Sequence, residues 1–283
     1  MPHITTRTIR PFIVIFLFLL MIILFGACQL LPGESITYLP TPTFPPFPQP
    51  TPAPKATALS STAPASPGMI ISKQLVEDGK NLYTLKLNYP SLEGASDQRF
   101  QLFNQEILKL VERIRQDFKT NVQAYNATPD PNFAPSFLTS DYVIENGSSG
   151  LLSVRFNVSS YMTGAAHPNQ NAATLNLDIA NSKVLALKDL FKPGADYLTP
   201  ISNYCLQDLK KQARLEWDTG AAPKDENYQN WNITPSGLLI SFDPYQVASY
   251  ALGPQAVTIP YSALKDILNS SGPLAVFVNH LNN

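Results

Sequence analysis

Histidine is the side chain on which acid–base catalysis near neutral pH is most simply built. Beyond the N-terminal apolar segment the chain contains only His167 and, near its C-terminal end, His280. A hydrolase would therefore use His167 with Asp189 or Asp243, but the sequence lacks the Gly-x-Ser-x-Gly turn of many serine hydrolases. It also lacks His-Glu-x-x-His, paired cysteines and a P-loop, so it indicates no metal or cofactor. Paired carboxylates for glycoside cleavage stay open, because such residues meet only in the fold.

Two segments contain side chains suited to binding. In YMTGAAHPN, residues 161–169, the histidine precedes a proline, which favours an extended or turn conformation. In Asp-Pro-Tyr at 243–245 the aspartate suits a turn and the proline fixes φ. The tyrosines here and Tyr261 would anchor their loops if buried and stack on sugars if exposed, and His167 would bind a ligand or its own loop. The candidate binding residues are Tyr161, His167, Asn169, Asp189, Asp243, Tyr245 and Tyr250.

The first 28 residues have the pattern of a bacterial export signal. Arg7 and Arg10 precede an apolar run over residues 12–25, which is shorter than the roughly 20 residues that cross hydrocarbon. Glycine and alanine then precede Cys28, and the segment resembles the lipobox of bacterial lipoproteins, although that family more often has leucine where Phe25 stands. The resemblance implies that Cys28 carries lipid and attaches the chain to the membrane. An uncleaved anchor helix and an ordinary signal peptide are the alternatives, and all three place the rest outside the cytoplasm.

Residues 29–68 have the composition of a linker. Proline, threonine, serine and alanine dominate this segment, and Glu34 and Lys55 are its only charged residues. Such a composition cannot bury a core and favours the polyproline conformation. At about 3.1 Å per residue, the segment would reach on the order of 100 Å if fully extended. We interpret it as a disordered spacer between a folded module and the lipid surface.

The remaining residues, 69–283, are long enough for one larger domain or two small ones. They contain 20 acidic and 17 basic residues and no run of Lys or Arg, which argues against nucleic acid as a partner. Cys205 is the only cysteine in this range, so an internal disulfide is impossible. It follows Ile201 and precedes Leu209 at helical spacing, which predicts a buried, inert thiol.

Hydrophobic periodicity predicts an α+β fold in which antiparallel strands in hairpins pack with a few helices. Residues 82–89 alternate cleanly, and residues 172–180 place leucines inward and Asn176 and Asp178 outward. We place one small domain at 69–139, ending in a connection at 126–139, and a second domain at 140–283. The predicted strands are 69–77, 82–89, 140–146, 150–160, 172–180, 238–243 and 255–260, and the predicted helices are 97–124, 195–215 and 261–269.

Three segments of the C-terminal part carry a resemblance. They are YMTGAAHPN at 161–169, VLALKDLF at 184–191 and FDPYQVASYALGPQAVTIPY at 242–261. Their order and spacing resemble the extracytoplasmic domain of unknown function in lysozyme-sensing anti-sigma factors of the RsiV type. This resemblance implies a module that recognises cell-wall material or proteins that attack it.

The preceding part resembles the smaller domain found before that one and in peptidoglycan deacetylases of the PdaC type. The segments concerned are LNYPSLEG at 87–94 and DQRFQLFNQEI at 97–107, and the whole resemblance covers residues 69–275. About ten residues precede the apolar run, and the chain ends at Asn283 without a deacetylase domain. We therefore expect neither sigma-factor control nor deacetylation from this chain.

These observations favour a lipid-anchored, non-catalytic module of the cell envelope that binds peptidoglycan or a lysozyme-like protein. One alternative is a weak hydrolase, which requires His167 to meet Asp189 or Asp243 within hydrogen-bond reach. Another is a structural or accessory lipoprotein, which would expose an apolar patch of several hundred Å².

Overall fold

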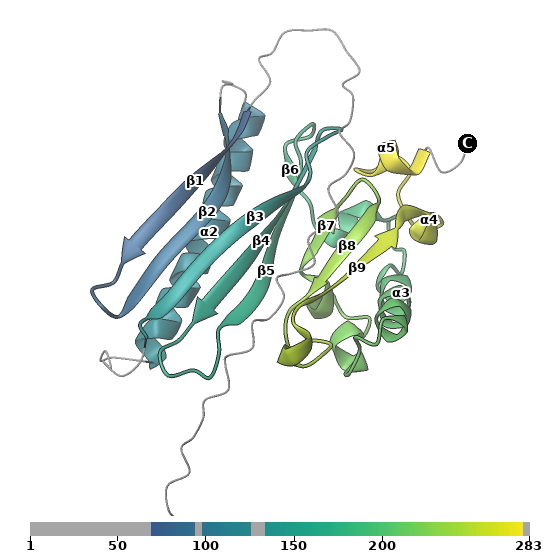
Figure 1. Ribbon diagram of the computed structural model, residues 1–283. Helices are drawn as coiled ribbons and strands as arrows, with labels where there is room; N and C mark the ends of the chain where they lie inside the picture. Colours follow the sequence, from purple (N-terminus) through teal and green to yellow (C-terminus); the bar gives the residue numbers. More distant parts are fainter. Residues whose placement is uncertain (1–68, 94–97, 126–133, 280–283) are drawn as a thin grey trace, which may run out of the picture. The chain divides into compact units, whose positions relative to one another are not determined.

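The computed structural model describes residues 69–93, 98–125 and 134–279 (Figure 1). The predicted export signal, Cys28, the proline-rich segment and His280 lie outside the described residues. The described part has the predicted α+β architecture, with a six-stranded and a three-stranded sheet. No helix within it is long and apolar enough to cross a membrane.

The six-stranded sheet follows the order of the chain, β1-β2-β3-β4-β5-β6. All neighbouring strands are antiparallel except β2 and β3, which are parallel. The helix α2, Gln98–Tyr125, lies between these two strands in sequence and provides the crossover that a parallel pair requires. The strands are β1 Met69–Asp78, β2 Tyr83–Glu93, β3 Ser136–Asn146, β4 Leu151–Tyr161, β5 Asn169–Asp178 and β6 Lys183–Val184.

Helix α2 covers one face of this sheet (Figure 1). Its apolar residues recur at helical spacing, and Phe103 and Ile107 are fully buried with Leu85 and Leu87 of β2. Alternation in β4 directs Val154 and other apolar side chains into the same core. The sequence predicts this helix and these strand faces correctly, because period 3.6 and period 2 are both sustained over long segments.

An ion-pair cluster ties the edge strand β1 to α2. Glu77 of β1 accepts hydrogen bonds from Arg115 Nε and Lys119 Nζ of α2, both at 2.6 Å, and from the hydroxyl of Tyr83. The hydrogen bonds from Lys119 and then Tyr83 lower the pKa of Glu77 from its ordinary value to about 2. The charged face of α2 therefore holds β1 in place.

A second layer begins after β6 and contains the three-stranded antiparallel sheet β7-β8-β9. Helix α3 packs on this sheet and buries Cys205 completely, which confirms the predicted burial and raises the pKa of the thiol. The elements are the single-turn helix η1 Leu187–Leu190, α3 Leu198–Lys211, the single turns η2 Asp218–Ala221 and η3 Asp225–Tyr228, β7 Trp231–Ile233, β8 Gly237–Phe242, the turn η4 Tyr250–Leu252, β9 Gln255–Pro260, α4 Tyr261–Leu264 and α5 Ala275–Val278.

The two sheets meet through a buried polar cluster. Asn232 of β7 is fully buried and donates to Ser153 Oγ of β4 at 2.8 Å. Ser153 in turn donates to Asn176 Oδ1 of β5 at 2.6 Å, and Asn176 Nδ2 donates to the carbonyl of Trp231 at 2.8 Å. The prediction that Asn176 and Asp178 face solvent is therefore wrong: Asn176 is 3% and Asp178 is 7% exposed, because the second sheet covers this face.

Strand pairing also bears on the division that we place between residues 139 and 140. This position lies inside β3. Because β3 pairs with β2 of the preceding part, one sheet contains strands from both sides of the division. The described residues form two apolar cores, one around α2 and one around α3.

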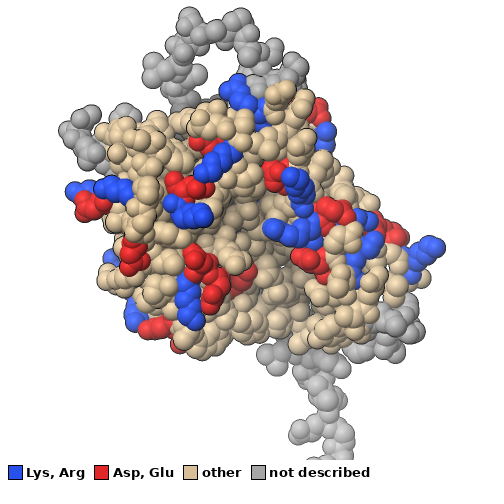
Figure 2. Space-filling view, turned by 180° about the vertical axis from the view of Figure 1, so that it is seen from behind, with Lys and Arg blue, Asp and Glu red and all other residues tan. Residues whose placement is uncertain are grey.

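On the face in Figure 2, Lys and Arg side chains are interspersed with Asp and Glu.

Candidate functional site

Three aromatic side chains from two loops stack beside one another. His167, in the loop between β4 and β5, lies with its ring centroid 3.7 Å from that of Tyr250 at an interplanar angle of 23°. Tyr245, which follows β8, stands 6.4 Å from His167 and 6.0 Å from Tyr250 in similarly oriented planes. We call His167, Tyr245 and Tyr250 the aromatic cluster. Because Tyr245 is 55% exposed, the cluster presents an aromatic face to solvent.

Hydrogen bonds fix the histidine ring in this cluster. His167 Nδ1 lies 2.9 Å from the carbonyl oxygen of Pro168, which can only accept, so Nδ1 carries the proton. The hydroxyl of Tyr250 donates to the same carbonyl at 2.7 Å. His167 Nε2 lies 3.2 Å from the hydroxyl of Tyr245, which donates to it when the ring is neutral. His167 therefore bonds its own loop, which is one of the two predicted alternatives, and also lies in a partly exposed cluster.

The loop that carries Tyr245 is closed by its own hydrogen bonds. Tyr245 has φ +67°, a left-handed conformation that is uncommon for a bulky residue. Its N–H donates to the carbonyl of Ala248 at 2.9 Å, and Gln246 Oε1 accepts the N–H of Asp243 at 3.2 Å. The side chain of Gln246 also donates to the carbonyls of Gly220 and Asn227, at 3.0 and 2.9 Å. These bonds hold a strained residue so that its ring stands out of the surface.

Asp243 connects this loop to the edge of the first sheet. Its Oδ1 accepts the N–H of Ala172 of β5 at 2.7 Å, and its Oδ2 accepts the amide of Asn171 at 3.1 Å. Ala172 lies in the part of β5 beyond its short pairing with β6. Burial raises the pKa of Asp243, and the bonds from Ala172 and Asn171 oppose that rise only in part. Asp243 therefore positions the aromatic cluster.

The other candidate residues contact neighbours outside the aromatic cluster. Tyr161 stacks on Phe137 at the end of β3, with ring centroids 5.6 Å apart. Asn169 is exposed at the start of β5, opposite Ser160. Asp189 accepts the N–H of Ala186 at 2.8 Å and pairs with Lys183 at 2.9 Å. The sequence assigns these residues to the same motifs, but their side chains serve different neighbours.

The hydrolase hypothesis requires a pairing that these residues do not make. Both ring nitrogens of His167 are taken by Pro168 and Tyr245, and neither Asp189 nor Asp243 is a hydrogen-bond partner of the ring. Tyr261, a further candidate anchor, is 4% exposed and donates to the carbonyl of Thr234 at 2.8 Å. Among the described residues, no group of three His, Cys, Asp or Glu side chains is placed to hold a metal ion.

Sequence reasoning missed two features around the cluster. Gly220 lies so close to the loop that a Cβ atom on it would stand 1.6 Å from the carbonyl oxygen of Gln246. The N–H of Trp217 donates to the carbonyl of Val247 at 3.0 Å, and Trp217 is 40% exposed beside this loop. A Trp-Asp-Thr-Gly segment has no periodic pattern, so only the proximity of η2 to the loop gives these residues a role.

Two family models match different parts of the chain. Residues 188–262 match the family described as a protein of unknown function, DUF3298, and residues 76–170 match the family described as deacetylase PdaC. The peptidoglycan-N-acetylmuramic acid deacetylase PdaC of Bacillus subtilis is 32% identical over 200 residues, which are 69% of this chain and 40% of that protein. The anti-sigma-V factor RsiV of the same organism is 26% identical over 204 residues, 68% of each chain.

A solved structure supports the fold. The crystal structure of a DUF3298 family member from Bacteroides fragilis superposes with a TM-score of 0.55 at 20% identity, covering 76% of this chain and 98% of that chain. The present chain spans less than half of the length of the Bacillus deacetylase. Together the matches support an extracytoplasmic, envelope-related module. Along the chain, the match to the PdaC family model precedes the match to the DUF3298 family model, and RsiV is similar to this chain over 68% of its own length.

Proposed function

We propose that this chain is a non-catalytic binding module attached to the outer side of a bacterial membrane by lipid on Cys28. The segment 29–68 serves as its spacer, and the aromatic cluster of His167, Tyr245 and Tyr250 binds the sugar faces of cell-wall glycan. The relation to a protein named as a peptidoglycan deacetylase supports a wall glycan as the ligand. No cofactor is required for such a role.

The observation that carries this proposal is the exposure of Tyr245 in a strained, closed loop. A tyrosine whose ring served only to fill a core would be buried, whereas this ring is 55% exposed. Its φ of +67° costs on the order of 1 kcal/mol and persists only because the loop bonds hold it. A rigid exposed aromatic ring loses little conformational entropy when a ligand packs against it, which makes it an efficient binding residue.

Tyr245→Ala tests the assignment of the ligand site. We expect the full chain, purified in detergent, to bind isolated cell-wall sacculi and the variant to bind at least about tenfold more weakly, a typical loss for a central aromatic contact. Tyr245→Phe keeps the ring and should retain most binding. Tyr125→Ala removes a tyrosine that is 72% exposed at the end of α2 and is the matched control. Equal retention of Tyr245→Ala and the unaltered protein would refute the site.

A lysozyme-like protein is the second candidate ligand, and the similarity to RsiV over 68% of both chains favours it. The same loop would then contact protein surface, where aromatic side chains are also enriched at binding hot spots. Immobilised lysozyme provides the matching assay. Retention on lysozyme but not on sacculi, lost in Tyr245→Ala, would select the protein ligand.

Cys28→Ser tests the anchor. Two or three acyl chains on one cysteine would hold the protein durably at a membrane, since each buried methylene contributes about 0.8 kcal/mol. We expect the unaltered chain to enter the detergent phase of a temperature-induced phase separation and to incorporate labelled fatty acid. Cys28→Ser should incorporate none, and a label that persists in this variant would contradict lipidation at Cys28.

A further inference from the structure

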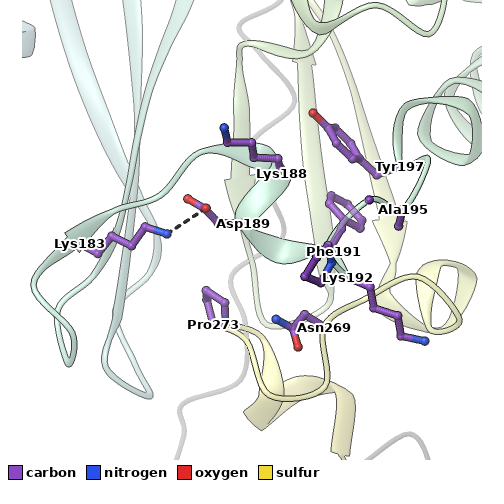
Figure 3. A pocket seen from close by; sticks show the side chains of 11 residues that line it. Lys183, Lys188, Asp189, Phe191, Lys192, Ala195, Tyr197, Asn269 and Pro273 are labelled. Carbon is purple, nitrogen blue, oxygen red and sulfur yellow. Dashed lines mark ion pairs between the residues drawn. The ribbon is translucent and has the colours of Figure 1, made fainter.

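The strongest unassigned feature is a pocket of about 440 Å³ on the second layer (Figure 3). It lies between the segment from Lys183 to Tyr197 and the loop that contains Asn269 and Pro273. None of the residues of the aromatic cluster lines it, so it is a separate site.

Backbone hydrogen bonds hold the two walls of this pocket together. Phe191 forms a β-bridge with Leu268, and the N–H of Lys192 donates to the carbonyl of Ile267 at 2.9 Å. The N–H of Asn269 donates in the opposite direction to the carbonyl of Leu190 at 3.0 Å. These backbone bonds fix the two segments that carry the lining side chains relative to each other.

The lining carries an excess of positive charge. Three lysines, Lys183, Lys188 and Lys192, line the pocket with a single carboxylate, Asp189. Burial would raise the pKa of Asp189, but the bonds from Lys183 and from the N–H of Ala186 lower it on balance, so this carboxylate is ionised at neutral pH and neutralises one lysine. The sequence shows no run of basic residues, because these lysines are spaced five and four residues apart. Their ammonium groups point in different directions: that of Lys183 meets Asp189, and that of Lys192 donates to the carbonyl of Asp266 at 2.7 Å (Figure 3).

The remaining lining suits the body of a small molecule. Phe191 and Tyr197 stack with ring centroids 4.8 Å apart at an interplanar angle of 8° and form an aromatic wall. Asn269 Oδ1 accepts the N–H of Ser271 at 3.1 Å, which leaves its amide nitrogen as the donor for a ligand. A volume of 440 Å³ is far larger than a bare ion and falls in the range of small-molecule sites, roughly 300–1,000 Å³.

We propose that this pocket binds a small ligand that bears an anionic oxygen group, a phosphate or a carboxylate, on a polyol or sugar body. Lys188 contacts the anionic group, and Lys192 joins it by exchanging its hydrogen bond to the carbonyl of Asp266, since ammonium groups bind phosphate and carboxylate as point charges. The Phe191–Tyr197 wall and Asn269 contact the body. This inference is independent of the aromatic cluster and holds whether or not that cluster binds glycan.

Calorimetric titration of the full chain in detergent tests this proposal. The probes are glycerol 3-phosphate and glucuronate, with glycerol and glucose as their neutral counterparts. We expect one or both anionic probes to bind with a dissociation constant on the order of 1 mM or below and the neutral probes not to bind. Binding should weaken as salt rises, because these lysines are exposed and screened. Equal heats from charged and neutral probes would overturn the proposal.

Variants locate the binding. The double variant K188Q/K192Q should lower the affinity for the anionic probe at least about tenfold, while K210Q, an exposed lysine paired with Asp218 outside the pocket, should not change it. Ala195→Phe, which fills the pocket without removing charge, should also abolish binding. Circular dichroism confirms that each variant folds. Unchanged affinity in K188Q/K192Q would place the anion elsewhere, whereas unchanged binding in Tyr245→Ala distinguishes this site from the aromatic cluster.

Discussion

Gly220→Ala is expected to destabilise the protein by about 3 kcal/mol, at the upper end of overpacking costs, and to displace the loop that carries Tyr245. The added Cβ would stand 1.6 Å from the carbonyl oxygen of Gln246 and 2.5 Å from its carbonyl carbon. A flexible side chain could move aside, but here the obstacle is backbone. The loop must therefore shift, and the bonds from Gln246 to Gly220, Asn227 and Asp243 must break or lengthen.

Urea unfolding followed by circular dichroism measures the stability loss, and retention on sacculi measures the loss of ligand binding. Gly147→Ala is the matched control, because a Cβ there meets its nearest atom, on Ile144, at an ordinary 3.5 Å. We expect the control to change stability by less than about 1 kcal/mol. If Gly220→Ala were as stable as the unaltered protein and bound equally well, the proposed role of η2 in holding the loop would be wrong.

Glu145→Ala is expected to destabilise the protein by about 3–5 kcal/mol, because it removes the carboxylate from a buried ion pair. Arg155 of β4 donates from Nε to Glu145 of β3 at 2.8 Å, and both side chains are more than nine-tenths buried. Asn157 Oδ1 also accepts from the guanidinium at 2.7 Å.

Two further variants separate charge from packing in this pair. Asp218→Ala removes a partner from the exposed pair with Lys210 and should cost less than about 1 kcal/mol. Replacing both members, Glu145→Leu with Arg155→Met, should recover most of the loss, since apolar side chains often substitute well for a buried ion pair. Chemical denaturation measures all three. A loss below about 1 kcal/mol for Glu145→Ala would show that water reaches Arg155.

The sequence predicts those elements in which apolar residues recur regularly over many positions, because such a repeat marks the face that packs on the core. Helix α2 and strands β2 and β4 each alternate or repeat over many residues, and the structure places them as expected. Cys205 is likewise predicted correctly, because it continues the apolar stripe of α3. Short elements such as β7, with three residues, contain too few positions for a period to be visible.

The polar face of β4 and β5 shows where pattern reasoning fails. Ser153, Arg155 and Asn176 alternate with apolar residues and so indicate a solvated face, yet all three are buried. Ser153 accepts a hydrogen bond from Asn232 and Asn176 accepts one from the N–H of Ile233, both donors more than fifty residues further along the chain, while Arg155 donates to Glu145 of the neighbouring strand. Hydrophobicity records the cost of burying a polar group alone and carries no information about a distant partner.

The candidate site is predicted in part for the same reason. Its residue types are apparent from the sequence, because His167, Tyr245 and Tyr250 belong to unusual segments. Their assembly is not apparent, since 78 residues separate the hydrogen-bonded side chains of His167 and Tyr245. Only the structure shows that Asp243 and Asp189 have different positions: Asp243 supports the loop of Tyr245, and Asp189 lines the separate pocket.

The position of β1 determines how the fold would respond to mechanical load. The proline-rich segment leads directly into Met69, so tension along it would enter through β1, which within the described residues pairs on one side only, with β2. Peeling would begin at Met69 and meet the exposed pair of Lys73 with Glu93 first. It would then reach Glu77, whose ion pairs with Arg115 and Lys119 attach the strand to α2. The strand next to the spacer would thus yield in stages under force, and Ile70 and Leu75 would leave the core around α2 with it.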